Sequence, residues 1–222
     1  MSTDHTHYDQ RYFDFQQGIA QFGGWANRSK FADRLAPTDT VLDFGCSSGH
    51  LLAQLSCARR IGVEVNPVAI AEAKNRLDAV YTDVAEVPAE SVDKIISNHA
   101  LEHVAHPLTE LQKLYRVLKP GGTIILVVPC ETVACRYVPD DINAHLYSWS
   151  PSNLGNLLTK AGFKVESAAP YAHKWPPHTY FRYARFGRGV FDLVCKAYAR
   201  WDRSWTQVRA VAIKPLAPDI DS

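Results

Sequence analysis

The chain has 222 residues, of which 46% are hydrophobic and 21% are charged, and its formal net charge is +1. This ordinary globular composition excludes a fibrous repeat, a largely disordered chain and a polycation that coats nucleic acid. The longest unbroken apolar run, 124–128, is far shorter than the roughly 20 residues of a membrane-spanning helix.

The beginning of the sequence and its cysteines bear on the compartment. The first ten residues are polar and lack a basic-then-apolar secretion signal, and the five cysteines form no CxxC pair. An odd number of cysteines without such a pair indicates reduced thiols. We therefore expect a cytoplasmic protein.

Residues 1–36 form a polar and aromatic lead-in, distinct from a main domain of residues 37–222. Its aromatic residues recur at roughly helical spacing, and Gly23-Gly24 should interrupt the helix. Two interpretations are open. The segment is either an N-terminal helix packed on the core or a flap that closes over a ligand site.

From residue 39 onward, short apolar strands alternate with helices. The predicted strands are 40–44, 60–65, 79–81, 94–97, 123–128, 163–167 and 207–214. The predicted helices are 51–55, 67–77, 107–118, 150–161 and 185–201, and Lys119-Pro120-Gly121-Gly122 is a strong stop-and-turn signal. This alternation predicts an α/β fold with a mostly parallel sheet and ligands at the carboxyl ends of its strands.

The segment 171–205 differs from the rest of the chain in composition. It holds seven Lys or Arg residues against two Asp, and ten of the 24 aromatic residues. We interpret it as a basic, aromatic insertion before the last strand. Four roles are open: a covering helix, a lid over an acceptor pocket, a dimer contact, or a helix whose residues 182–205 rest on an anionic membrane.

The turn after the first strand carries the clearest chemical signal. The strand ends at Asp43-Phe44, small residues follow at Gly45, Ser47 and Gly49, and a helix begins next. Such a turn lets a ligand approach the backbone, and the helix start suits a phosphate or a carboxylate. Glu64 follows Asp43 by 21 positions, where an acid usually grips ribose hydroxyls.

This turn separates two classes of nucleotide ligand. A dinucleotide fingerprint G-x-G-x-x-G needs glycine at 45, 47 and 50, but the sequence has Ser47 and His50. The serine would crowd a pyrophosphate and the histidine would obstruct helix packing. The methionine moiety of S-adenosylmethionine carries only a carboxylate and an amine, so this turn favours it over NAD(P).

Five short motifs occur along the chain in the same order as in a known family, and they support S-adenosylmethionine as the ligand. They are Val41-Leu42-Asp43-Phe44-Gly45-Cys46-Ser47-Ser48-Gly49, Gly62-Val63-Glu64, Tyr81-Thr82-Asp83-Val84, Ser97-Asn98-His99-Ala100-Leu101-Glu102-His103-Val104 and Leu118-Lys119-Pro120-Gly121-Gly122. With them the sequence resembles the class I S-adenosylmethionine-dependent methyltransferases that modify small molecules, lipids and sugars, over residues 38–170 and the last strand. The resemblance implies a Rossmann-like, doubly wound sheet of seven strands, mostly parallel with an antiparallel last strand.

The resemblance also implies a role for each matching residue. Asp43, Gly45, Ser47 and Gly49 would shape the methionine pocket, although Ser47 departs from the usual middle glycine. Glu64 would bind the ribose, Asp83 and the Val84 backbone would bind adenine, and Asn98 would lie near the sulfonium. Capping a turn is the alternative for Asp83, and satisfying loop backbone is the alternative for Asn98.

The catalytic base is open between two histidines. His103 and His99 are the candidates, because a base near the methyl group needs a pKa near neutrality. His99-Ala100-Leu101-Glu102-His103 also matches an H-x-x-E-H zinc pattern, but Pro107 cuts the expected helix short. We therefore expect no metal. His145, Tyr147, Tyr8 and Tyr12 could line the acceptor pocket.

The acceptor is the least determined part of the function. A basic, aromatic insertion suits acidic glycans, so we expect O-methylation of a sugar or small hydroxylated metabolite, with surface polysaccharide synthesis as one setting. Pro129-Cys130 raises cytosine methylation through a thiolate, but no basic partner can be assigned, so nucleic acid is not expected. A methyltransferase-like binding protein without turnover is a further alternative, and an oligomer is compatible with the sequence.

Overall fold

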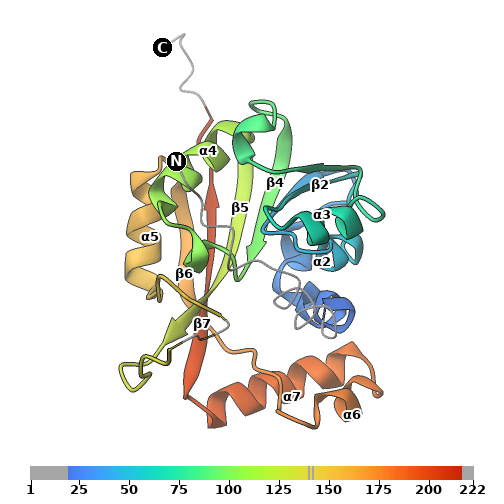
Figure 1. Cartoon of the computed structure of the whole chain (residues 1–222), viewed down its shortest axis with the longest axis vertical. Coiled ribbons are helices and arrows are strands. Elements are labelled where there is room, and N and C mark those ends of the chain that lie inside the picture. The colour runs from blue at the N-terminus through green and yellow to red at the C-terminus, as the bar shows by residue number, and fades with distance from the viewer. Residues whose placement is uncertain (1–19, 140, 142, 217–222) are drawn as a thin grey trace.

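A seven-stranded sheet forms the centre of the computed structural model, which describes residues 20–139, 141 and 143–216 (Figure 1). The strands are β1 (Thr40–Phe44), β2 (Arg59–Val63), β3 (Ala79–Tyr81), β4 (Val92–Asn98), β5 (Leu118–Glu131), β6 (Lys164–Tyr171) and β7 (Trp205–Ile213). Their order is β3-β2-β1-β4-β5-β7-β6. β1 to β5 pair in parallel, whereas β7 is antiparallel to both β5 and β6. The predicted mostly parallel sheet with an antiparallel last strand is confirmed.

The helices begin where the sequence supplies caps. They are α2 (His50–Ala53), α3 (Pro67–Ala73), α4 (Pro107–Val117), α5 (Pro151–Lys160), α6 (Tyr180–Ala184) and α7 (Arg188–Trp201), and residues 20–27 are also helical. Asn66 caps α3 ahead of its first-turn proline, and Ser150 and Asn153 form a capping box on α5. Among the described residues, no helix has the length and hydropathy needed to cross a bilayer.

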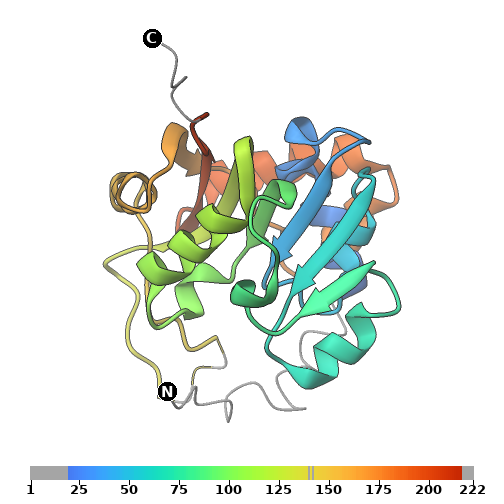
Figure 2. The same ribbon diagram turned by 90° about the horizontal axis from the view of Figure 1, so that it is seen from above.

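Helices cover both faces of the sheet (Figure 2). Leu111 and Leu114 of α4 and Leu158 of α5 are fully buried in one apolar cluster with β4 and β5. Leu52 of α2 and Ala73 of α3 belong to a second cluster on the other face. This three-layer arrangement buries the apolar strands on both sides and leaves the carboxyl edge of the parallel strands for other segments.

The insertion 171–205 lies across that carboxyl edge, where α6 and α7 run below the sheet in Figure 1. Phe191 and Cys195 of α7 are buried against Ala26 of the helix at 20–27, with Phe22 and Trp175 packed beside them. The N-terminal helix and the insertion therefore form one layer, although they are far apart in the sequence. The earlier lead-in residues, including Tyr8 and Tyr12, lie outside the described residues.

The glycine pair in the N-terminal helix does not break it, contrary to the sequence prediction. Residues 20–27 are helical through Gly23-Gly24. A Cβ atom on Gly24 would lie 2.6 Å from the backbone carbon and oxygen of His50. Gly24 is therefore a contact residue. Because it has no side chain, the helix at 20–27 can pack against the start of α2.

The turn predicted at Lys119-Pro120-Gly121-Gly122, between a helix and the next strand, is also wrong. β5 begins at Leu118, so these four residues lie inside the strand. The pairing with β4 jumps from Val92↔Leu118 to Lys94↔Thr123, and Gly121 takes a φ of +78°. The turn residues thus form an irregularity in the strand, as glycines in strands often do.

Candidate methyl-donor and acceptor site

The structure brings the predicted site residues to one edge of the sheet. Asp43 lies near the end of β1, Glu64 directly follows β2, and Asn98 ends β4. Asp83 follows β3 by two residues. Because β3, β2, β1 and β4 are neighbours in the sheet, these residues lie along adjacent strand ends.

The loop after β1 has a backbone conformation that depends on small residues. Gly45, Ser47 and Gly49 have φ values of +74°, +48° and +78°. A Cβ atom on Gly45 would lie 2.4 Å from the Cβ atom of Ala100, which follows β4. The loop after β1 therefore packs directly on the loop after β4, and only glycine fits at position 45.

Glu64 holds this loop to the next one. Its Oε2 atom accepts a hydrogen bond from the Ser47 N–H at 2.8 Å, and Oε1 accepts from the N–H groups of Val65 and Asn66 at 2.8 and 2.9 Å. Burial raises the pKa of Glu64, although these backbone donors act in the opposite direction. Asp43 is 2% exposed, and burial together with the charge of Glu64 raises the pKa of its carboxyl well above the ordinary value.

Asp83 is more open than the other two acids, with a side chain that is 48% exposed. It accepts from the Ala85 N–H at 2.8 Å and pairs with Lys113 at 3.0 Å. The Ala85 N–H, followed by Lys113, lowers the pKa of Asp83. Asp83 thus caps the short turn η4 (Val84–Glu86), which was the alternative role, and its following residue Val84 is buried.

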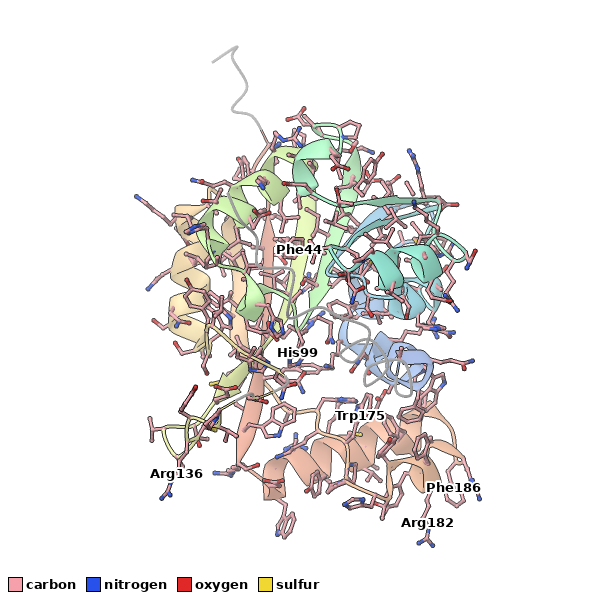
Figure 3. The ribbon with its side chains drawn as sticks, viewed as in Figure 1. Phe44, His99, Arg136, Trp175, Arg182 and Phe186 are labelled. Atoms are coloured by element: carbon pink, nitrogen blue, oxygen red, sulfur yellow. The ribbon has the colours of Figure 1, made fainter. Side chains whose placement is uncertain are left out.

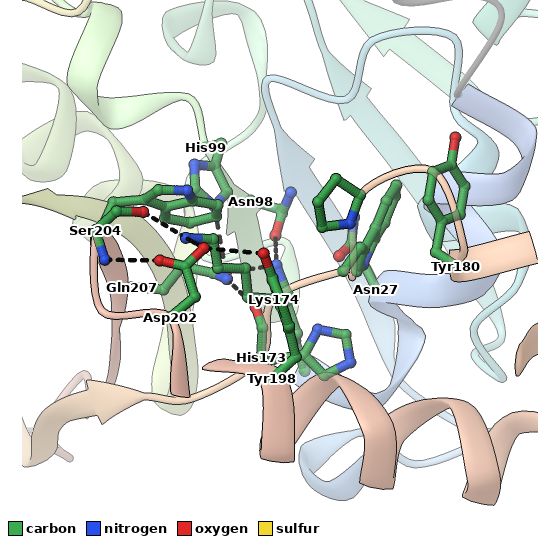
Figure 4. Close-up of a pocket in the computed structure, with 14 residues that line it drawn as sticks. Asn27, Asn98, His99, His173, Lys174, Tyr180, Tyr198, Asp202, Ser204 and Gln207 are labelled. Carbon is green, nitrogen blue, oxygen red and sulfur yellow. Dashed lines mark hydrogen bonds and ion pairs between the residues drawn. The ribbon is translucent and has the colours of Figure 1, made fainter. Parts of the chain in front are cut away.

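A cavity of about 560 Å³ opens beside the end of β4 (Figure 4). Its polar floor consists of Lys30, Asn98, His99 and Gln207. The Lys30 Nζ atom donates to Asn98 Oδ1 at 2.9 Å and to Gln207 Oε1 at 2.6 Å. Asn98 is therefore held by a buried lysine rather than by loop backbone.

Aromatic side chains from the insertion and β7 form the walls of this cavity: Trp175, Tyr180, Tyr198 and Trp205. Trp175 lies between the strand ends and α6, whereas Arg182 and Phe186 point away on the outer side (Figure 3). If the insertion is a lid, the sequence places Tyr171, Trp175, His178 and Tyr180 near the site. Trp175 and Tyr180 line the cavity, whereas Tyr171 and His178 are not among the lining residues.

The two candidate histidines have different surroundings. His99 lines the cavity, with its Nδ1 atom 3.2 Å from Glu102 Oε1 and its Nε2 atom 3.3 Å from Gln207 Oε1. The His103 ring lies 5.1 Å from the His145 ring and does not line the cavity. The structure therefore separates these two histidines, which the sequence named together as candidates.

Glu102, His103 and His145 form a group that could hold a metal ion. Their ligand atoms lie within 4.8 Å of one another, and His145 Nδ1 is 2.7 Å from Glu131 Oε1. The zinc-protease geometry is not formed, because η5 (Leu101–His103) is a three-residue 3-10 turn and His99 precedes it with a φ of +55°. The absence of a metal stays a prediction, which elemental analysis of the purified protein tests.

Three residues that line the cavity were not predicted from the sequence: Lys30, His173 and Gln207. Lys30 and Gln207 are separated by 177 positions, and each looks like an ordinary surface residue in the sequence. The available signal was the apolar setting of both residues, since Lys30 precedes Phe31-Ala32 and Gln207 begins the predicted last strand.

Comparison with known proteins identifies the family. The family model described as "Methyltransferase domain" matches residues 7–168, which is more than half of the chain. The chain belongs to the S-adenosylmethionine-dependent methyltransferases.

Individual relatives agree with this assignment. The methyltransferase is 34% identical over 160 residues to an uncharacterized methyltransferase of Mycobacterium bovis, covering 65% of this chain and 74% of the relative. It is 25% identical over 178 residues to the mitochondrial ubiquinone biosynthesis O-methyltransferase of Mus musculus, covering 65% and 48%. In fold it is similar to a SAM-dependent methyltransferase of Archaeoglobus fulgidus, with a TM-score of 0.63, 19% identity, and coverage of 93% and 100%.

The residues at the strand ends fit the donor that this family uses. S-adenosylmethionine supplies an electrophilic methyl group on a sulfonium. The methyltransferase offers a small-residue loop closed by Glu64, a second carboxylate at Asp83 two residues beyond β3, and a cavity beside Asn98. A nucleoside along β3, β2 and β1 would present its sulfonium toward β4, and the neighbouring cavity is where an acceptor can enter.

Proposed function

We propose that this methyltransferase O-methylates a small hydroxylated acceptor, a sugar or a related metabolite, with surface polysaccharide synthesis as one setting. The observation that carries this proposal is the cavity beside the end of β4. Its volume of about 560 Å³ suits one small molecule, and its floor is polar while its walls are aromatic. A sugar face or a flat ring can lie against such walls while its hydroxyls reach the floor.

The donor site follows from the matching residues. Asp43, Gly45, Ser47 and Gly49 shape the methionine pocket, Glu64 takes the ribose hydroxyls, Asp83 and the Val84 backbone hold adenine, and Asn98 lies beside the sulfonium. The chain's own contribution is to fix donor and acceptor in line, since alignment supplies much of the rate in such a displacement. His99 and His103 remain the sequence-based candidates for removing the acceptor proton.

One relative bears on the accepting atom of the proposed reaction. The Mus musculus relative is named an O-methyltransferase, which supports oxygen as the accepting atom. A nucleic-acid acceptor and a binding protein without turnover stay alternatives, which the test below distinguishes. A cytoplasmic location, expected from the unpaired cysteines, and an oligomeric state stay predictions.

The test is direct. Purified protein is incubated with S-adenosylmethionine and a panel of sugars, sugar nucleotides, phenols and hydroxy acids, and products are examined for a mass gain of one methyl group. A methylated oxygen that disappears in Glu64→Ala supports the proposal. Binding of S-adenosylhomocysteine without any product would favour the binding protein, and methylated RNA or DNA would favour the nucleic-acid alternative.

We also infer a peripheral contact with anionic membranes through the outer side of the insertion. Phe186, Leu193 and Trp201 are 73%, 67% and 80% exposed, although they are large and apolar. The exposed cations Arg182, Arg185, Lys196, Arg200 and Arg203 lie among them in the sequence. Apolar side chains flanked by cations are the pattern of a helix that lies on an anionic bilayer.

A further inference from the structure

Lys30 is a buried cationic side chain held by two neutral amides. It belongs to η2 (Arg28–Lys30), is 3% exposed and lines the cavity. Its Nζ atom donates to Asn98 Oδ1 and Gln207 Oε1. The Cε atom and these two acceptors take three of the four tetrahedral positions on Nζ, which fixes the direction of the one that remains.

No carboxylate pairs with Lys30 among residues 20–139, 141 and 143–216. The other lysine of the cavity, Lys174, differs because it pairs with Asp202 at 2.8 Å. Burial lowers the pKa of Lys30 to about 7, and the more distant Cys195 on α7 and Glu102 on η5 oppose this shift. His173, between β6 and α6, is kept neutral at pH 7, because burial and then Lys30 lower its pKa to about 4.

His99 is less suited to take a proton from an acceptor. Both of its ring nitrogens face oxygen atoms, Glu102 Oε1 at 3.2 Å and Gln207 Oε1 at 3.3 Å. Each ring nitrogen is therefore already directed at an oxygen atom of the protein, Glu102 Oε1 or Gln207 Oε1, and neither is directed at a free part of the cavity.

We propose that Lys30 is the general base of this methyltransferase and that its acceptor is an acidic hydroxyl, a phenol or an enol, held between the aromatic walls. This inference rests on the proposed O-methylation and narrows its acceptor. As the acceptor oxygen forms its bond to the methyl carbon, the carbon–sulfur bond breaks and leaves its electron pair on sulfur. The acceptor proton passes to the lone pair of Nζ, so one positive charge is present before the step and one after it.

The strength of Lys30 as a base determines how acidic the acceptor hydroxyl must be. An amine that is half neutral at pH 7 is a weak base toward an alcohol, but phenols ionise near pH 10, as tyrosine does. A bound phenolate would also supply the negative charge that Lys30 lacks. The aromatic walls suit a phenol ring, since aromatic pairs add roughly 0.5–1.5 kcal/mol beyond the area they bury.

The experiment uses the full chain saturated with S-adenosylhomocysteine, and 4-nitrophenol as the probe, because its phenolate absorbs visible light. At pH 6 we expect the probe to gain phenolate absorbance when it binds the wild type. Lys30→Met should lose at least nine-tenths of that gain, whereas Lys214→Met should keep most of it, because Lys214 is a buried lysine outside the cavity that pairs with Glu90 at 3.0 Å. An equal response of both variants, or no response from the wild type, would overturn the proposal.

A second readout follows the titration of Lys30 itself. In protein labelled with ¹³C at lysine Cε, one resonance that is absent from Lys30→Met should titrate with a midpoint near pH 7 and move upward when 4-nitrophenol is added. A midpoint near the ordinary value of 10.5 would overturn the proposal. If Lys30→Met does not fold, Asn98→Asp replaces it. Its carboxylate beside Nζ should raise the midpoint by more than one unit, and an unchanged midpoint would count against the proposal.

The proposed function can survive the failure of this inference. Methylation of a sugar, with no phenolate signal and no lysine that titrates near pH 7, would leave O-methylation standing and remove Lys30 as the base.

Discussion

The Ser47 backbone N–H and the Glu64 carboxylate lie 2.8 Å apart, and their hydrogen bond joins the loop after β1 to the loop after β2. These two loops carry the residues that we assign to the methionine and ribose parts of the donor. The carboxylate therefore fixes the two loops of the proposed donor site relative to each other.

Glu64→Ala should weaken binding of S-adenosylhomocysteine by at least tenfold. The substitution removes the acceptor of three backbone N–H groups, and hydrogen bonds to a charged group contribute about 1.5–3 kcal/mol each. Titration calorimetry measures the change. Glu72→Ala is the matched control, because Glu72 is a half-exposed glutamate on α3 that pairs with Arg76. Equal affinities of the two variants would contradict the assigned role of Glu64.

Two adjacent glycines in the helix at 20–27 should respond oppositely to alanine. Gly24→Ala places a Cβ atom 2.6 Å from the His50 backbone, so we expect a loss of about 1–3 kcal/mol in the free energy of unfolding. Gly23→Ala meets Trp175 at an ordinary 3.6 Å and should gain about 0.5–1 kcal/mol from the better helix propensity of alanine. Urea unfolding monitored by circular dichroism distinguishes them. A stabilising Gly24→Ala would show that the helix does not dock on α2.

The sequence predicted that Asp43, Glu64 and Asp83 lie at neighbouring strand ends, because the signals for these strand ends are local. Asp43, Glu64 and Asp83 each follow a strand that can be recognised from a few apolar residues, and adjacent parallel strands present their ends at one edge. Local patterns also misled. Gly24 was interpreted as a helix break, although its role is to let the helix contact His50, which is 26 positions away in the sequence.

The acceptor cavity could not be predicted in the same way. Its floor depends on Lys30 meeting Gln207 across 177 positions, and no short motif encodes that pairing. The buried state of Lys30 arises because the insertion and the N-terminal helix cover the strand ends together. Only the presence of a basic, aromatic segment near the site was visible in the sequence.

The buried lysine should leave a signature in the pH dependence of stability. The pKa of Lys30 is about 7 in the folded chain, against 10.5 for an ordinary lysine. Between these values the unfolded state binds more protons than the folded state, so the free energy of unfolding rises with pH. The slope from this group approaches about 1.4 kcal/mol per pH unit at its steepest.

Comparing the wild type with Lys30→Met separates the contribution of Lys30 to the pH dependence of stability from that of other titrating groups. Urea unfolding of the wild type and of Lys30→Met is measured at intervals from pH 6 to pH 8.5. We expect the advantage of Lys30→Met over the wild type to shrink as the pH rises above about 7, because the wild type then no longer buries a charge. Lys174→Met, whose lysine is paired with Asp202, should run parallel to the wild type over the same range. A constant difference between wild type and Lys30→Met would show that Lys30 stays protonated.

The outer side of the insertion should bind anionic membranes. Flotation with vesicles of phosphatidylcholine and phosphatidylglycerol should carry the protein upward, and vesicles of phosphatidylcholine alone should not, because the flanking arginines and lysines need anionic headgroups. Added salt should weaken the binding by screening these charges.

Leu193→Glu should abolish flotation, since it places a carboxylate on the exposed apolar side of α7. Leu216→Glu is the matched control, because Leu216 is 73% exposed and lies beside Gly121 near the start of β5, away from the insertion. Flotation that is equal in both variants, or the same for neutral vesicles, would assign these exposed residues to something other than a membrane.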